Sequence, residues 1–114
     1  MNSNDLATLL CKVLDSKKAQ DVVKINVIDK TSLADYFVVA SARSSTQVKA
    51  LCEQCEAEAE KQGAQIIRKD GLADARWAVV DFGDVILHVF NDETRLFYHL
   101  ERLWGEGEKF STED

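Results

Sequence analysis

Apolar residues recur at two different spacings in the first part of the chain. Leucine and valine return every three or four positions over residues 3–16, which predicts an amphipathic helix that Ser3 can cap. Over residues 21–29, valine and isoleucine alternate with polar residues, as in a strand with one covered face. The unbroken apolar run 36–40 predicts a strand buried on both faces. We therefore expect a helix followed by two strands.

The pattern then returns to helical spacing. A long helix should open at Ser44 or Ser45 and end at Gly63, because glycine is a frequent C-terminal stop. Its apolar stripe includes Cys52 and Cys55, while glutamate and lysine occupy its other faces. A short strand is predicted near residues 65–68.

The last third of the chain predicts a hairpin and a closing helix. Residues 77–81 and 84–90 read as strands joined by a tight turn at residues 82–83. Asp92 can cap a final helix whose apolar side ends at Trp104. The order αββαβββα predicts one small α/β domain over residues 1–105, a mixed sheet flanked by helices. Residues 106–114 form a polar tail that we expect to be disordered.

Charge and composition narrow the function classes. The 114 residues carry a formal charge of −6, which repels phosphate backbones and favours a basic protein surface as partner. No apolar run approaches the length of roughly 18 residues that a membrane span needs. The polar N-terminus lacks the pattern of a secretory signal, so we expect a cytoplasmic protein without a membrane partner.

The cysteines form one C-x-x-C match, at Cys52 and Cys55, with Cys11 elsewhere. A redox pair gains thiolate character at a helix N-terminus, but this pair lies about two turns into the predicted helix. A structural zinc needs four ligands, and no second close pair exists in the sequence. We interpret both thiols as core residues and expect no bound metal and no cofactor.

Two features suggest nucleotide chemistry but do not support each other. Asp81 and Asp84 flank the hairpin turn, and paired carboxylates can hold a divalent metal. The segment 40–45 joins a strand to a helix, as phosphate-binding loops do, yet it contains no glycine for close phosphate approach. Turn carboxylates are the better interpretation of the two aspartates.

Aromatic and polar residues near the hairpin favour a binding surface. Trp77 opens a strand beside the polar stretch that includes Asp70, and Tyr98 lies off the apolar stripe of the final helix. Tryptophan and tyrosine are frequent interface anchors, although both rings can also cover the edge of the core. His88 could act as a general base, but no serine or cysteine nucleophile pattern accompanies it in the sequence. A partly covered or surface-lining histidine is therefore the better interpretation.

Three runs in this order resemble the Iojap family, whose bacterial members are the ribosomal silencing factors (RsfS). They are residues 35–40 (DYFVVA) followed by Gln47 and Val48, residues 77–90 (WAVVDFGDVILHVF), and residues 95–104 (RLFYHLERLW). The likeness covers residues 5–105, and the W-x-x-x-D-x-G-D-V-x-x-H-x-F block is its most specific part.

The resemblance implies a fold distantly like that of nucleotidyltransferases, without their catalytic residues. It also implies a translational repressor that binds a large-subunit ribosomal protein, number fourteen in the bacterial scheme, and sterically blocks small-subunit joining when nutrients run low. We expect Trp77 and Tyr98 to anchor this contact, with polar contacts from Asp70, His88, Asn91 and Asp92.

Two alternatives from other classes remain open. One is a degenerate nucleotidyltransferase-like domain that binds nucleotide and Mg²⁺ through Asp81 and Asp84. The other is a dimerising adaptor, since exposed aromatic residues also make a weak homodimer plausible. The chain-wide likeness favours the silencing factor, without direct dependence on nucleic acid.

Overall fold

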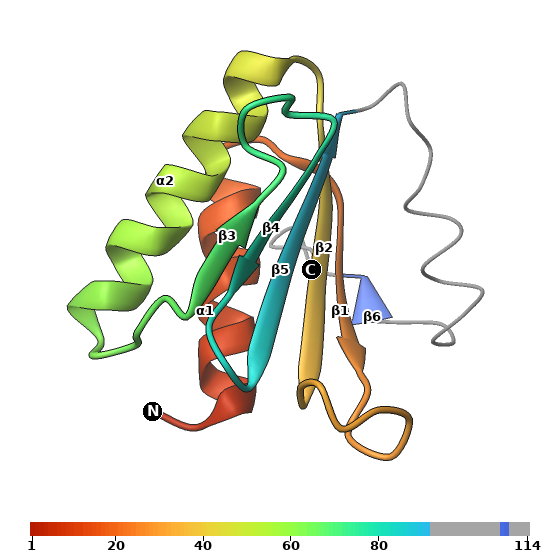
Figure 1. Ribbon diagram of the computed structural model, residues 1–114, viewed down its shortest axis with the longest axis vertical. Coiled ribbons are helices and arrows are strands. Elements are labelled where there is room, and N and C mark those ends of the chain that lie inside the picture. Colours follow the sequence, from red (N-terminus) through yellow and green to blue (C-terminus); the bar gives the residue numbers. More distant parts are fainter. Residues whose placement is uncertain (92–107, 110–114) are drawn as a thin grey trace.

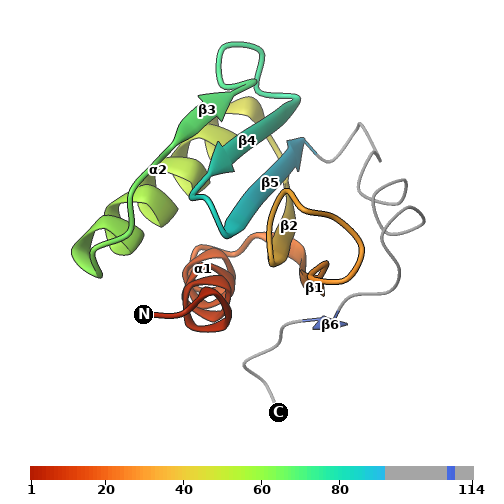
Figure 2. The same cartoon turned by 60° about the horizontal axis from the view of Figure 1, so that its bottom comes forward.

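The computed structural model describes residues 1–91 and 108–109. They form one mixed sheet and two helices, and both of these helices lie on the same face of the sheet (Figure 1, Figure 2). In chain order the elements are α1 (Ser3–Ser16), β1 (Gln20–Asn26), β2 (Tyr36–Ala42), α2 (Ser45–Lys61), β3 (Arg68–Asp70), β4 (Trp77–Asp81), β5 (Val85–Asn91) and β6 (Glu108–Lys109). The predicted α/β class is confirmed, and so is the predicted order from α1 to β5. The helix predicted after Asp92 lies outside the described residues.

The sheet has the strand order β3-β4-β5-β2-β1-β6. The pair β2–β5 is parallel and the other four pairs are antiparallel, so the sheet is mixed as predicted. Six of the seven β2 residues are buried, which confirms a strand covered on both faces. The chain returns from β2 through α2 to the far edge, and β4 then brings β5 back beside β2. The sequence block that begins at Trp77 therefore forms β5 at the centre of the sheet and its neighbour β4.

Local capping explains where the helices begin. Asn2, rather than the predicted Ser3, caps α1, because its side-chain oxygen accepts a hydrogen bond from the Asp5 amide at 2.8 Å. Ser44 caps α2 by accepting from the Gln47 amide at 3.1 Å. The predicted stop at Gly63 is also confirmed, since this residue has a φ of +87° two positions beyond the helix.

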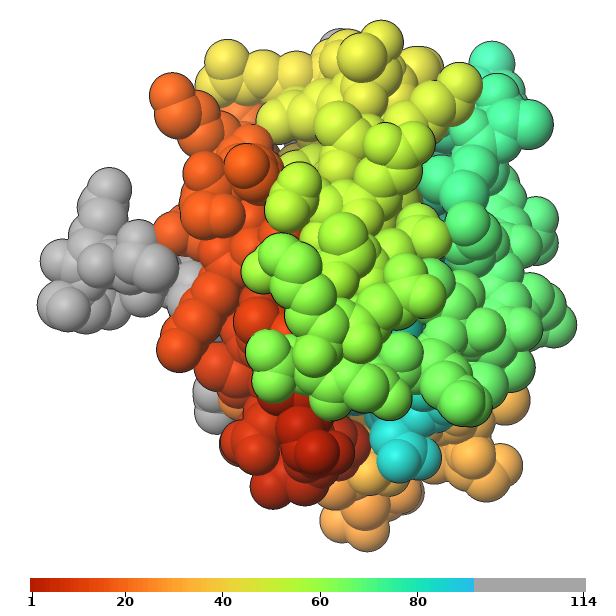
Figure 3. All heavy atoms as spheres, turned by 90° about the vertical axis from the view of Figure 1, so that its left-hand side faces the viewer, coloured from red at the N-terminus to blue at the C-terminus, as the bar shows by residue number. Residues whose placement is uncertain are grey.

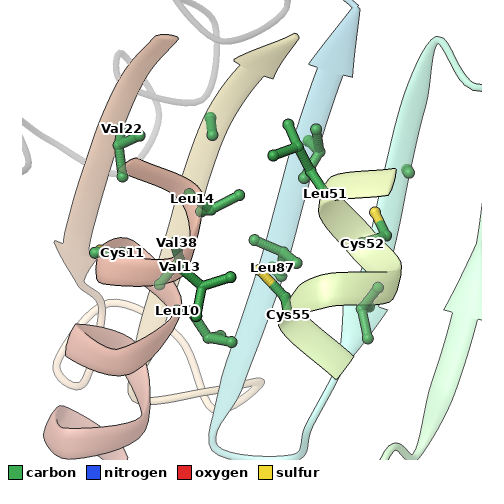
Figure 4. Close-up of a cluster of buried hydrophobic side chains, with 14 of the residues drawn as sticks. Leu10, Cys11, Val13, Leu14, Val22, Val38, Leu51, Cys52, Cys55 and Leu87 are labelled. Atoms are coloured by element: carbon green, nitrogen blue, oxygen red, sulfur yellow. The ribbon is translucent and has the colours of Figure 1, made fainter. Parts of the chain in front are cut away.

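The main core lies between the sheet and the two helices, which lie side by side across one face of the molecule (Figure 3). Both helices present an apolar stripe to the strands, and α1 and α2 contact each other above β2 and β5. Figure 4 shows Leu10 and Leu14 of α1 with Leu51 and Cys55 of α2 and Leu87 of β5. The predicted helix stripes are the buried ones.

The position predicted for one strand also needs correction. The strand predicted near residues 65–68 lies further along the chain, at Arg68–Asp70. These are the residues that pair with the β4 backbone, from Asp81 back to Val79. Of the predicted tail 106–114, the structure describes Glu108–Lys109. These two residues pair antiparallel with β1 at one edge of the sheet.

Candidate functional site on the sheet face opposite the helices

Strand alternation gives the sheet a second face, on the side away from α1 and α2. Asp70 of β3 lies opposite Val79 of β4, and Val79 lies opposite His88 of β5. In the next row, Trp77 lies opposite Phe90. Since side chains two residues apart in a strand share a face, three of the predicted partner-binding residues, Asp70, Trp77 and His88, come together here.

The remaining predicted residues are not part of this described group. Asn91 follows Phe90 in β5, so alternation directs it to the opposite side, where its register partner is the buried Ala42. Its backbone amide donates to the Arg76 carbonyl at 2.9 Å, which ties the end of β5 to the start of β4. Asp92 and Tyr98 lie outside the described residues, so their role stays a prediction.

Trp77 is the exposed centre of the group. The residue is 41% exposed, as expected for a ring with one face open to solvent. The indole stacks on Phe90 with 5.3 Å between ring centroids and 25° between planes. Its Nε1–H donates a hydrogen bond to His88 Nδ1 at 3.1 Å. A large apolar surface is thus held rigidly at the end of two paired strands.

His88 lies beneath this surface, with only 7% of the residue exposed. Its ring meets Phe37 edge-on at 5.0 Å between centroids. Burial lowers the pKa of His88 to about 4, so the imidazole is neutral at neutral pH. Its Nε2 is buried and has no hydrogen-bond partner among the described residues. His88 is therefore buried more fully than the partly covered or surface-lining histidine that the sequence predicted.

Gly71 is a site residue that the sequence interpretation missed. Its φ is +78°, a backbone conformation that favours glycine, and a Cβ there would overlap the Trp77 carbonyl oxygen. Its amide donates to the Asp70 carboxylate at 2.8 Å. Close approach of the loop to the Trp77 backbone therefore requires glycine. A lone glycine within the polar loop was the available signal, but nothing in the sequence connected it to Trp77.

Of the two aspartates at the hairpin, Asp81 has a side chain that serves the turn. Asp81 Oδ1 accepts a hydrogen bond from the Gly83 amide at 2.7 Å, which confirms the prediction of a turn carboxylate. Asp84 is exposed, and its backbone carbonyl accepts from the amides of Asp35 and Tyr36. Within residues 1–91 and 108–109, no three His, Cys, Asp or Glu side chains are grouped closely enough to hold a metal ion.

The loop before α2 uses its own side chains to satisfy the helix N-terminus. Ser44 accepts from the Gln47 amide, and the Gln47 side chain accepts from the Arg43 amide at 2.7 Å. These two contacts are the two halves of a capping box shifted by one residue. Two of the amides that a bound phosphate would need are therefore already engaged.

Cys52 and Cys55 are free thiols buried in the main core, which confirms their interpretation as core residues. Burial raises the pKa of Cys52 to about 12 and raises that of Cys55 as well. A thiol that stays protonated is a poor nucleophile and a poor metal ligand.

Known proteins resemble the chain over most of its length. The chain matches the family described as "Ribosomal silencing factor during starvation" over residues 1–114. It is 38% identical over 106 residues to the ribosomal silencing factor RsfS of Halalkalibacterium halodurans, covering 93% of this chain and 91% of that protein. The chloroplastic protein Iojap of Zea mays is 30% identical over 99 residues, which are 87% of this chain and 43% of the maize protein.

A solved structure has the same fold. The crystal structure of a protein from Chromobacterium violaceum superimposes with a TM-score of 0.87 at 30% identity, covering 98% of this chain and 94% of that one. In the part of the chain that the structure describes, neither helix is long and apolar enough to cross a membrane.

Proposed function

Because the chain belongs to the ribosomal silencing factor family, we propose that it is a noncatalytic translational repressor that binds the free large ribosomal subunit in the cytoplasm. It docks on ribosomal protein number fourteen of that subunit, and the bound factor sterically prevents the small subunit from joining when nutrients are scarce. The observation that carries the proposal is the rigidly held, 41% exposed Trp77 on the sheet face opposite the helices.

Trp77 has the properties of an interface anchor. Its ring offers a large apolar area, and its stacking on Phe90 and its bond to His88 hold it in place before a partner arrives. Anchors of this kind dominate binding energy because little conformational entropy is lost on docking. The exposed Asp70 on the same face supplies a polar rim.

The charge of the chain suits the proposed partner. A formal charge of −6 attracts a basic ribosomal protein and steers the encounter, an effect that weakens as salt rises. The same charge disfavours docking on exposed ribosomal RNA. Affinity for large subunits should therefore fall with ionic strength, and the protein component should carry the contact.

Binding agrees better with the described chemistry than catalysis does. The Asp81 carboxylate is engaged with the Gly83 amide, and the thiols of Cys52 and Cys55 are buried and protonated. These groups leave the nucleotidyltransferase alternative without a supporting observation. The dimerising adaptor remains the competing reading of the exposed Trp77 face, because a second copy of the chain is an alternative occupant.

A subunit-joining experiment tests the proposal. Isolated large and small subunits are mixed with rising concentrations of the protein and separated on sucrose gradients. We expect the factor to sediment with the large subunit and the yield of joined ribosomes to fall. An unchanged ratio of joined to separate subunits, with the factor at the top of the gradient, would contradict the proposal. If the factor there is a dimer, the result would favour the dimerising adaptor.

A further inference from the structure

His88 is buried and contacts neighbouring aromatic side chains of the same sheet face. The residue is 7% exposed and makes an edge-on contact with Phe37, while the exposed Trp77 indole lies between its Nδ1 and solvent. A group so covered is poorly placed to touch a partner directly. Among the described residues, the polar contact of its side chain is with the indole of Trp77.

That contact determines how the indole is oriented. Stacking on Phe90 sets the plane of the ring but leaves it free to slide and turn within that plane. A hydrogen bond of 3.1 Å from Nε1–H to His88 Nδ1 removes this freedom. Phe37 and Phe90 in turn pack against the imidazole and hold it, with ring centroids 5.0 Å and 6.5 Å away.

The bond also specifies where the imidazole proton lies. An indole Nε1–H can only donate, so His88 Nδ1 must carry a lone pair. The proton of the neutral ring is then on Nε2, the atom that is buried without a described partner. The other tautomer would place two donors against each other and lose the contact with Trp77.

We infer that His88 is a positioning residue: in its Nε2–H tautomer, it holds the Trp77 indole in the single orientation that the partner recognises. The inference rests on the proposed function for its effect on ribosome binding, whereas the orientation of the indole is a property of the free protein. It replaces the direct polar contact predicted for His88 with an indirect role. Partner binding then depends on His88 without any atom of His88 reaching the partner.

The first test uses the unaltered protein and no ribosomes. Nitrogen-15 NMR of the imidazole distinguishes the tautomers, and the indole Nε1–H signals of the two tryptophans are assigned with the variant Trp104→Phe. We expect an Nε2–H tautomer for His88 and slow solvent exchange of the Trp77 Nε1–H despite its exposed ring. A proton on Nδ1, or exchange as fast as in a free indole, would overturn the inference.

The second test compares variants for binding to large subunits. His88→Phe keeps an aromatic ring but removes the acceptor, whereas His88→Asn places a side-chain oxygen near the former Nδ1. We expect His88→Phe to speed exchange of the Trp77 Nε1–H and to weaken binding roughly fivefold to tenfold, as for a side chain no longer held before docking. His88→Asn should restore part of both properties.

Ile86→Ala is the matched control, because Ile86 is on the same face of β5 but lies opposite Asp81, at the far end of β4 from Trp77. It should lower stability and leave both Trp77 readouts unchanged. Equal weakening by Ile86→Ala and a folded His88→Phe would reduce His88 to a packing residue and overturn the inference. If the unaltered protein fails to bind large subunits, the proposed function fails, and the NMR result still decides the positioning of Trp77.

Discussion

Replacing Gly71 with alanine tests how closely the loop before β4 packs against the Trp77 backbone. An alanine at a φ of +78° loses about 1–2 kcal/mol relative to glycine, because the left-handed region crowds its Cβ. The new Cβ would also overlap the Trp77 carbonyl oxygen and lie 3.0 Å from its carbon, so the loop or β4 must shift. Local backbone strain of this kind costs a further 1–3 kcal/mol, roughly. We expect Gly71→Ala to lower the free energy of unfolding by about 3 kcal/mol.

Gly63→Ala supplies the matched control. Gly63 has a similar φ of +87°, but a Cβ there would meet nothing within 4 Å. It should therefore cost only the conformational part, about 1 kcal/mol. Urea unfolding of both variants gives the difference, and NMR of the Trp77 Nε1–H reports whether the ring has moved. Equal losses for the two variants, or an unmoved Trp77 signal in Gly71→Ala, would refute the close-packing argument.

Three further predictions concern titration, thiols and the hairpin. Burial lowers the pKa of His88 from 6.5 to about 4. The stability that the neutral, buried His88 contributes is therefore fully present above pH 6.5 and is lost as the pH falls toward 4. The free energy of unfolding should drop by about 2 kcal/mol between pH 7 and pH 5, a slope that His88→Phe removes; an unchanged slope in a folded variant would contradict it. The thiols of Cys52 and Cys55 should not react with a disulfide reagent at pH 8 before unfolding, and the double valine variant should still bind large subunits; loss of binding by the folded variant would reopen a chemical role. Asp81→Asn keeps an acceptor for the turn and should change stability and binding little, whereas Asp81→Ala should cost about 1 kcal/mol in urea unfolding; loss of binding in a folded Asp81→Asn would point to a metal.

The sequence patterns were sufficient for most of the fold. Apolar periodicity and the turn at residues 82–83 located α1, α2, β4 and β5, because these elements bury one continuous stripe or face. The short strand β3 was misplaced because its three residues are all exposed, so no apolar pattern marks it. Its position follows from pairing with β4, which is a tertiary effect.

The candidate site was predictable only in part. Trp77 stood out as an aromatic residue beside a polar loop, and its exposure agrees with that interpretation. The burial of His88 beneath it depends on the register of β4 against β5, which places Trp77 opposite Phe90 and so diagonal to His88. The need for glycine at position 71 depends on where the loop crosses the Trp77 backbone. Neither relation is encoded in local spacing.

The most direct test of the central claim is the dissociation constant for isolated large ribosomal subunits, measured for Trp77→Ala beside Leu33→Ala. Leu33 is 67% exposed in the loop before β2, and β2 runs parallel to β5, so it lies at the opposite end of the sheet from Trp77. Both variants remove an exposed apolar side chain, and thermal melts establish that both are folded. We predict that Trp77→Ala weakens binding by about 2 kcal/mol, or ~30-fold, while Leu33→Ala binds like the unaltered protein. A folded Trp77→Ala that binds as tightly as Leu33→Ala would show that this face does not hold the ribosome.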